Sequence, residues 1–183
     1  KVIIHNIDSL CYRYLEPQPP ISSICFLLFD HMGGINTALF LLFRGGTIVH
    51  VDDRDTDSIC QAIQDNSVAL LPTTPSFLSQ LLMGNCHKTF DLSSLKVISY
   101  GTEVMSLSVL KKLNEVFPDC RFKQTYGLSE TGVFQIRSRS NDSLWFKFSD
   151  KGVQYKVEDG ILWVKTKSNL LAKLIFTNEG VNP

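Results

Sequence analysis

The stretch LKVISYGTEVMSLSVLKKLNEVFPDCRFKQTYGLSETG, residues 95–132, decides the fold class of this chain. It contains a short apolar run at 95–99, a segment with helical spacing at 106–117 and a second short run at 121–125. The residues that can cap this helix or that share one of its sides are Ser106, Ser108, Leu107, Leu110 and Leu113. A strand, a helix and a strand joined by short loops are typical of a βαβ unit and therefore predict parallel strands.

The same alternation continues upstream of this stretch. Strands are expected at 21–29, 47–51 and 68–71, and helices at 35–44, 55–65 and 74–82. The strands are continuous apolar runs, as in a sheet that is covered on both faces. The helix at 35–44 is apolar on nearly every side and is predicted to be buried, and a short strand followed by a helix is expected in the first fifteen residues. The fold class that follows is α/β, with a parallel sheet flanked by helices.

The pattern changes after Gly132. Short segments with alternating apolar residues follow one another at 133–139, 144–148, 153–157 and 161–165, with turn residues between them. They predict a small antiparallel β unit of barrel-like type. We therefore expect two domains, a parallel α/β subdomain at 1–132 and the start of a small β subdomain at 133–183.

The composition excludes several classes of protein. The 183 residues are 44% hydrophobic and 20% charged with a formal net charge of +0, so no basic stripe points to nucleic acid as a partner. The apolar runs are shorter than the ~20 residues that a membrane span needs. The five cysteines are odd in number and form no CxxC pair, which argues against a disulfide framework or a zinc site and favours a cytoplasmic location. The abrupt ends, without an initial Met, suggest an internal piece of a larger protein.

Candidate ligand-binding residues follow the expected strands. In an open parallel sheet the ligand binds beyond the carboxyl ends of the strands, where the loops 30–34, 72–76, 100–103 and 126–132 would meet. In the last of these loops Tyr126 offers a flat ring, and Gly127 and Gly132 allow close backbone approach. Its polar groups are Ser129, Glu130 and Thr131, which suit phosphate oxygens and Mg²⁺. This set would hold a nucleotide with its metal, although a glycine-bounded turn with incidental polar residues would have the same composition.

The loop at 126–132 resembles the Tyr-Gly-x-Thr-Glu signature of the adenylate-forming superfamily, with Ser129 in place of the usual Thr. That superfamily comprises acyl-CoA and aryl-CoA synthetases, adenylation domains of peptide synthetases and firefly luciferase. Other segments resemble further family motifs in the same order along the chain: 1–5, 29–34, 44–47, 74–76, 100–103 and 159–165. The resemblance therefore runs nearly from end to end.

The resemblance implies an AMP-forming acid–thiol ligase that activates a carboxylate with ATP and Mg²⁺. The acyl-AMP would pass its acyl group to CoA or to the phosphopantetheine thiol of an acyl carrier protein, as in fatty acid metabolism. An amino-acid-activating adenylation domain and a non-catalytic nucleotide-binding relative are the alternatives. In both alternatives the fold would be the same.

The resemblance also implies roles for individual residues. Tyr126 would stack on adenine, Ser129 would contact the α-phosphate, and Glu130 would bind Mg²⁺. The remaining nucleotide-binding residues would be Lys1, Gly101, Thr102, Glu103, Thr125 and Gly127. His31 would lie at the acyl pocket and, with Ser129 and Glu130, take part in catalysis; the other acyl-binding residues would be Gly34, Ser76 and Gly101.

Two points of the resemblance stay open at this stage. Asp30 after Phe29 matches amino-acid-activating members, in which an Asp holds the substrate amine, whereas His31 with Gly34 matches fatty-acyl and aryl ligases; we favour the second alignment because 32–34 continues it. The body of the phosphate loop, the ribose-binding Asp and the C-terminal lid domain with its catalytic lysine would lie outside these 183 residues. We therefore expect the piece alone to lack ligase activity, because adenylation needs preorganised charge and closure.

Overall fold

The predicted parallel α/β sheet is confirmed by the computed structural model, which describes residues 20–30, 32–128, 132–149, 152–165 and 171–175. Five parallel strands lie in the order β2-β1-β3-β4-β5. Their bounds are Ser22–Ile24 for β1, Thr47–Val49 for β2, Leu70–Thr73 for β3, Val97–Tyr100 for β4 and Arg121–Gln124 for β5. The strand and helix expected in the first fifteen residues lie outside the described part of the chain.

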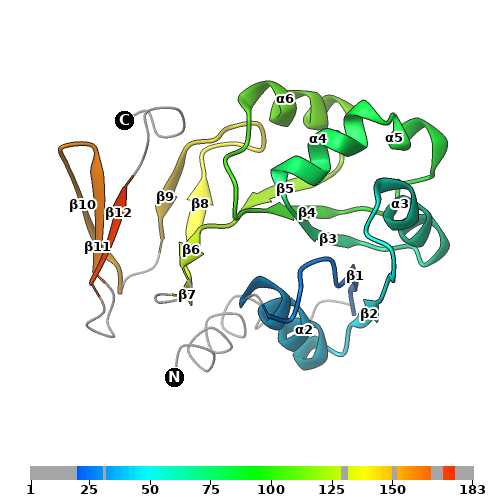
Figure 1. Ribbon diagram of the computed structural model, residues 1–183, viewed down its shortest axis with the longest axis horizontal. Coiled ribbons are helices and arrows are strands. Elements are labelled where there is room, and N and C mark those ends of the chain that lie inside the picture. The colour runs from blue at the N-terminus through cyan, green and yellow to red at the C-terminus, as the bar shows by residue number, and fades with distance from the viewer. Residues whose placement is uncertain (1–19, 31, 129–131, 150–151, 166–170, 176–183) are drawn as a thin grey trace.

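Helices cover the two faces of this sheet. They are α2 (Met32–Arg44), α3 (Thr56–Asp65), α4 (Pro75–Met83), the short α5 (Cys86–Thr89) and α6 (Leu107–Val116). In Figure 1, α2 lies below the sheet, and α4 and α6 lie above it. The order of the strands explains this arrangement. α2 connects β1 to β2, whereas α3, α4 and α6 connect strands in the opposite direction across the sheet. Because right-handed crossovers that run in opposite directions place their helices on opposite faces, α2 lies on one face and the other three helices lie on the other.

Capping side chains set the start of α3 and α4. The Asp55 carboxylate accepts hydrogen bonds from the backbone N–H groups of Asp57 and Ser58, at 3.0 and 2.9 Å. The Thr74 hydroxyl likewise accepts from the Phe77 N–H, at 3.2 Å. Ser106 precedes α6 but makes no side-chain cap; its hydroxyl instead lies 2.8 Å from that of Ser108.

The main hydrophobic core lies between the sheet and the helices of the upper layer. Its fully buried members include Leu71, Leu78, Leu81, Ile98, Leu110 and Leu113. The prediction that α2 is buried is wrong for part of the helix. Leu41 is buried, but Leu42 and Phe43 are 68% and 64% exposed, because only one side of α2 faces the sheet within the described residues.

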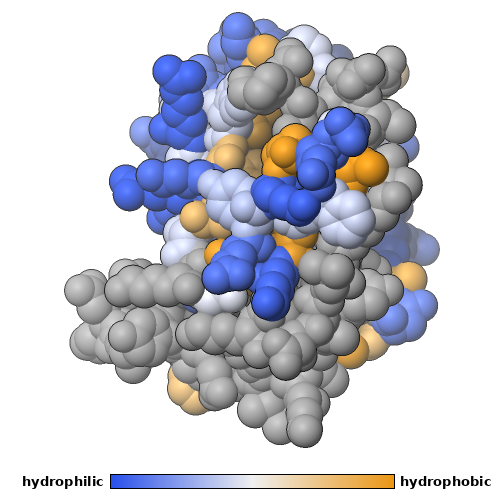
Figure 2. Space-filling view, turned by 90° about the vertical axis from the view of Figure 1, so that its left-hand side faces the viewer, coloured by the Kyte–Doolittle hydropathy of each residue, from blue (hydrophilic) through white to orange (hydrophobic). Residues whose placement is uncertain are grey.

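The region after β5 is antiparallel, as the alternating pattern indicated. Its strands form three small sheets, β6-β7, β8-β9 and β10-β11-β12. Their bounds are Gly127–Leu128, Gly132–Val133, Ile136–Ser138, Phe146–Phe148, Gln154–Glu158, Ile161–Lys165 and, for the unpredicted β12, Leu171–Ile175. Figure 2 shows the face at this end of the molecule, on which apolar residues lie between hydrophilic ones. The division into domains at residue 132 stays a prediction.

No helix among the described residues is long and apolar enough to cross a membrane; the longest, α2, has 13 residues.

Asn141 joins the β8–β9 hairpin to the parallel sheet. Its side-chain oxygen accepts a hydrogen bond from the Phe122 N–H at 2.7 Å. Its amide nitrogen donates to Asn114 Oδ1 at 2.7 Å and to the Cys120 carbonyl at 2.9 Å. The Asn141 side chain, in the turn of the hairpin, thus provides hydrogen-bond partners for backbone groups at the start of β5 and for a side chain on α6.

We expect Asn141→Ala to lower the free energy of unfolding by about 2 kcal/mol, because the Phe122 N–H and the Cys120 carbonyl lose their partner in a partly buried place. Urea unfolding followed by circular dichroism measures this change. Gln154→Ala on the exposed strand β10 is the control and should change the value by less than about 0.5 kcal/mol. Equal effects of the two substitutions would contradict the joining role of Asn141.

Candidate functional site

The candidate site lies at the carboxyl edge of the parallel sheet. The last residues of three neighbouring strands, Thr73, Tyr100 and Gln124, stand side by side in register. The loops that follow β3, β4 and β5 therefore begin next to one another. The strand order also reverses between β1 and β3, and ligands of open α/β sheets bind at such a switch point.

Ser76 and Glu103 connect two of these loops. The Ser76 N–H donates to Glu103 Oε2 at 3.0 Å, and the Ser76 hydroxyl donates to the same oxygen. The Glu103 carboxylate thereby lies at the N-terminus of α4, where negative charge is favourable. The Ser76 hydroxyl, which we predicted to line the acyl site, is committed to this bond. The resemblance implied that Glu103 belongs to the nucleotide-binding residues, and the bond of its side chain to Ser76 was not predicted.

Gly101 and Thr125 bring the loops after β4 and β5 into contact. A Cβ atom at Gly101 would overlap Thr125 Oγ1 and lie 2.9 Å from the Thr125 carbonyl oxygen, so only glycine fits. Thr125 is fixed in place by two bonds to the Tyr100 carbonyl, from its N–H at 2.8 Å and from its hydroxyl at 3.1 Å. Thr102, which follows Gly101, has a φ of 68°, and its hydroxyl donates a hydrogen bond to the Gly101 carbonyl at 2.6 Å.

Tyr126 belongs to an aromatic cluster at the start of the antiparallel region. Its ring centroid lies 5.3 Å from that of Phe146 and 6.2 Å from those of Phe134 and Phe148. Burial raises the pKa of the Tyr126 phenol to about 12, so the group is neutral near pH 7 and unsuited to act as a base. The residue is only half-buried, so it can pack against these rings and still present surface to a ligand.

Several buried polar atoms near this edge lack a hydrogen-bond partner within the described part of the chain. Thr73 Oγ1 and Gln124 Oε1 lie at the ends of β3 and β5, and Asn36 Oδ1 lies on α2. A fourth such atom, His87 Nδ1, lies on α5, beyond the far end of α4. Buried polar groups are normally paired, so the first three are candidates for contact with a ligand. Thr73 lies within the loop 72–76 that was expected to meet the ligand, whereas Asn36 and Gln124 were not predicted, although a polar residue that ends a buried strand at this edge, such as Gln124, is a usable signal.

The other predicted site residues divide into two groups. Gly34 is buried, and a Cβ atom there would overlap the Leu28 carbonyl and lie 2.6 Å from that of Leu27, so the position must stay small. Gly127 is exposed at the start of β6, and Asp30 is exposed before α2. Four predicted residues lie outside the described part of the chain: Lys1, His31, Ser129 and Glu130. The structure therefore brings together Ser76 with Glu103 and Gly101 with Thr125, and the binding roles of all the predicted site residues stay predictions.

Comparison with known proteins identifies the class. The AMP-binding enzyme family matches residues 2–155, and the chain belongs to this family. It is 31% identical over 116 residues to 4-coumarate–CoA ligase-like 5 of Oryza sativa subsp. japonica, a match that covers 63% of this chain and 21% of the relative. It is 28% identical over 145 residues to acyl-CoA ligase easD of Emericella nidulans, covering 76% and 25%. The chain thus spans about a fifth to a quarter of the length of these curated relatives.

Solved structures show the same fold at lower sequence identity. The amide bond synthetase McbA from Marinactinospora thermotolerans superposes with a TM-score of 0.70 at 20% identity, covering 90% of this chain and 36% of that one. The nonribosomal peptide synthetase FmoA3 in its α-methyl-L-serine-AMP bound form gives a TM-score of 0.71 at 15% identity, covering 93% and 22%. At these identities the likeness concerns the fold alone.

We expect Gly101→Ala to lower the free energy of unfolding by about 2–3 kcal/mol, because the added Cβ forces the loops after β4 and β5 apart. Urea unfolding measures the loss. Gly45→Ala is the control, since a Cβ there meets nothing within 4 Å and only the positive φ of 63° is strained, by about 1 kcal/mol. If Gly101→Ala unfolds at the same urea concentration as the wild-type protein, the close approach is not a constraint.

Proposed function

We propose that the full-length protein is an AMP-forming ligase that activates a carboxylate with ATP. The observation that carries this proposal is the joining of three loops at the carboxyl edge, through Ser76 with Glu103 and Gly101 with Thr125, next to the half-buried ring of Tyr126. Membership of the AMP-binding family and the CoA ligases among its relatives support it.

The proposed reaction has two steps. A carboxylate oxygen of the substrate attacks the α-phosphorus of ATP, the bond to the β-phosphate oxygen breaks, and acyl-AMP and pyrophosphate form. A thiolate then attacks the acyl carbon, and AMP leaves with the electron pair of the broken bond. The thiol would belong to CoA or to the phosphopantetheine of a carrier protein, so a small-molecule carboxylate and an acyl acceptor are the proposed partners.

The described residues would bind and orient the adenine. The neutral ring of Tyr126 offers a stacking surface, and the backbone at 101–103 together with the Thr125 carbonyl would pass along the base. Glycine at 101 lets this backbone lie close to Thr125. The Thr73 and Gln124 oxygens, which have no hydrogen-bond partner among the described residues, fit a polar ligand at the same edge. Preorganised polar groups of this kind need no rearrangement during the reaction.

The phosphate chemistry would fall to predicted residues. Lys1 and Ser129 would contact phosphate oxygens, and Glu130 would hold Mg²⁺. The ion, when bound, neutralises charge on the phosphates. His31 and Gly34 would border the acyl group. A cytoplasmic location and a part in fatty acid metabolism belong to this same proposal.

An amino acid is the second candidate substrate, because Asp30 is exposed, follows Phe29 and lies two residues before the first residue of α2. Substrate dependence separates the two candidates. Pyrophosphate exchange that requires an α-amine and is lost in Asp30→Ala would favour amino acid activation. Exchange that proceeds with fatty or aryl acids and is unchanged in Asp30→Ala would favour an acyl or aryl ligase.

We expect the full-length protein to catalyse ATP–pyrophosphate exchange with at least one member of a panel of carboxylic acids. Glu130→Ala should abolish the exchange. Tyr126→Leu should raise the KM for ATP about tenfold or more through the loss of base stacking. Tyr126→Phe keeps the ring and should stay within about threefold of the wild type.

Two results would argue against parts of this proposal. Absence of exchange with every acid in the full-length protein, under conditions where the protein is folded, would indicate a non-catalytic nucleotide-binding relative. Exchange by residues 1–183 alone would show that the lid domain is dispensable, since the chain spans only 21% of the rice relative.

A further inference from the structure

The β8–β9 hairpin has two chemically different faces. Its inner face carries Phe146 and Phe148, which pack against the ring of Tyr126. Its outer face carries the exposed side chains of Arg137, Arg139 and Lys147. Only the inner face is accounted for by the proposed adenine site, so the three cations of the outer face need a separate explanation.

The arrangement of these three cations does not stabilise the hairpin. Arg137 and Lys147 lie directly opposite each other in the antiparallel register, and like charges in such a pair are destabilising. Arg139 lies two residues further along the chain, directly after β8, and on the same face. None of the ion pairs among the described residues involves these three side chains. The acidic residue of the hairpin turn, Asp142, accepts a hydrogen bond from the Ser140 hydroxyl at 2.7 Å instead.

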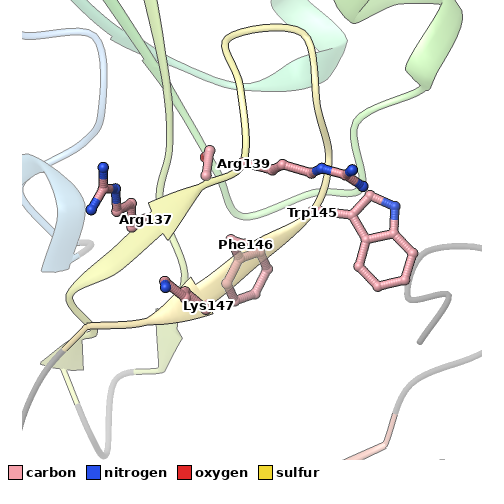
Figure 3. A pocket seen from close by; sticks show the side chains of 6 residues that line it. Arg137, Arg139, Trp145, Phe146 and Lys147 are labelled. Carbon is pink, nitrogen blue, oxygen red and sulfur yellow. The ribbon is translucent and has the colours of Figure 1, made fainter.

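A hollow lies beside these side chains. Its volume is about 480 Å³, and it is lined by Arg137, Ser138, Arg139, Trp145, Phe146 and Lys147. Figure 3 shows Arg139 extending toward Trp145, whereas Arg137 and Lys147 lie on the other side of the Phe146 ring. Trp145 is 43% exposed, and its carbonyl accepts a hydrogen bond from the Arg139 N–H at 2.9 Å. The hollow thus combines three cations with a partly exposed aromatic ring, and none of its lining residues in the described part of the chain is acidic.

The hairpin holds this arrangement in place. Asn141 fixes its turn to β5 and α6 through the hydrogen bonds described above. The inner aromatic rings fix its middle, and the Ser149 N–H donates to the Gln135 carbonyl at 2.8 Å at its open end. A site on a supported secondary-structure element is better preorganised than one on a loop.

We propose that the outer face of the β8–β9 hairpin binds phosphate groups of a second ligand, distinct from ATP. Guanidinium groups match phosphate oxygens in charge and geometry, and a partly exposed Trp offers a surface for an aromatic base. Tyr126, the proposed partner of the ATP adenine, packs against the inner face, whereas Arg137, Arg139 and Lys147 lie on the outer face. This inference rests on the proposed function. In that reaction the phosphate groups come from one of two sources, the nucleotide end of CoA or the released pyrophosphate.

Equilibrium binding to the full-length protein at low ionic strength tests this site. The probes are 3′,5′-ADP, which represents the nucleotide end of CoA, and inorganic pyrophosphate, each measured by calorimetry with the ATP site blocked by a non-hydrolysable ATP analogue. The double variant Arg137→Gln/Lys147→Gln and the single variant Arg139→Gln should each weaken binding about tenfold, as expected for the loss of charge-assisted hydrogen bonds. Lys88→Gln, which removes an exposed cation on α5, is the matched control and should stay within about twofold of the wild type.

The outcomes separate the ligand sources. Tight binding of 3′,5′-ADP with weak binding of pyrophosphate would assign the site to CoA, and equal binding of both would assign it to free phosphates; both results support a phosphate site. No binding of either probe, or binding unchanged in both hairpin variants, would overturn the proposal. Arg137→Lys keeps the charge but loses the planar guanidinium group, so it should weaken binding by less than the tenfold expected for the Gln variants.

The proposed ligase function can fail independently of this site. ATP–pyrophosphate exchange needs no CoA, so the hairpin variants should leave its maximal rate at saturating pyrophosphate unchanged. If the wild-type protein shows no exchange but loses probe binding in the hairpin variants, the ligase function fails and the phosphate site stands. Urea unfolding checks the folding of each variant, and removal of the like-charge pair should leave the midpoint equal or higher.

Discussion

The close approach of Gly101 to Thr125 is the constraint on which the candidate site depends. A side chain larger than hydrogen at Gly101 would overlap Thr125, and Thr125 cannot retreat because it makes two hydrogen bonds to the Tyr100 carbonyl. The two loops are therefore held together by the end of β4 itself. The Ser76–Glu103 bond extends the contact to the loop after β3, and three neighbouring strands thus present one connected edge.

The antiparallel region contributes to this edge through Tyr126. Tyr126 directly follows Thr125 in the chain, and its ring packs against aromatic side chains of β9 and against Phe134. The hairpin that supplies Phe146 and Phe148 is in turn joined to β5 by Asn141. The position of the proposed stacking residue therefore depends on packing well beyond its own loop, and the same hairpin places its cations on the side away from Tyr126.

Much of the fold follows from local pattern, because buried parallel strands and capped helices have distinct signatures. Other features need the folded chain. The strand expected at 21–29 is shorter, Ser22–Ile24, since the backbone of Leu27 and Leu28 instead packs against Gly34. The exposure of Leu42 depends on which side of α2 meets the sheet.

The site shows the same division. Its loops could be predicted from their places after the strands, but the Ser76–Glu103 bond joins residues 27 positions apart. The Thr73 oxygen, which lacks a hydrogen-bond partner in the described part of the chain, could be identified only once burial was known.

A crystal structure of the full-length protein with a non-hydrolysable ATP analogue tests the central claim most directly, that this edge binds the adenine of ATP. We predict that the base lies between the ring of Tyr126 and the backbone at 101–103, within hydrogen-bond distance of the Thr125 carbonyl. Adenine bound elsewhere, with the Tyr126 ring covered by protein side chains, would contradict the account.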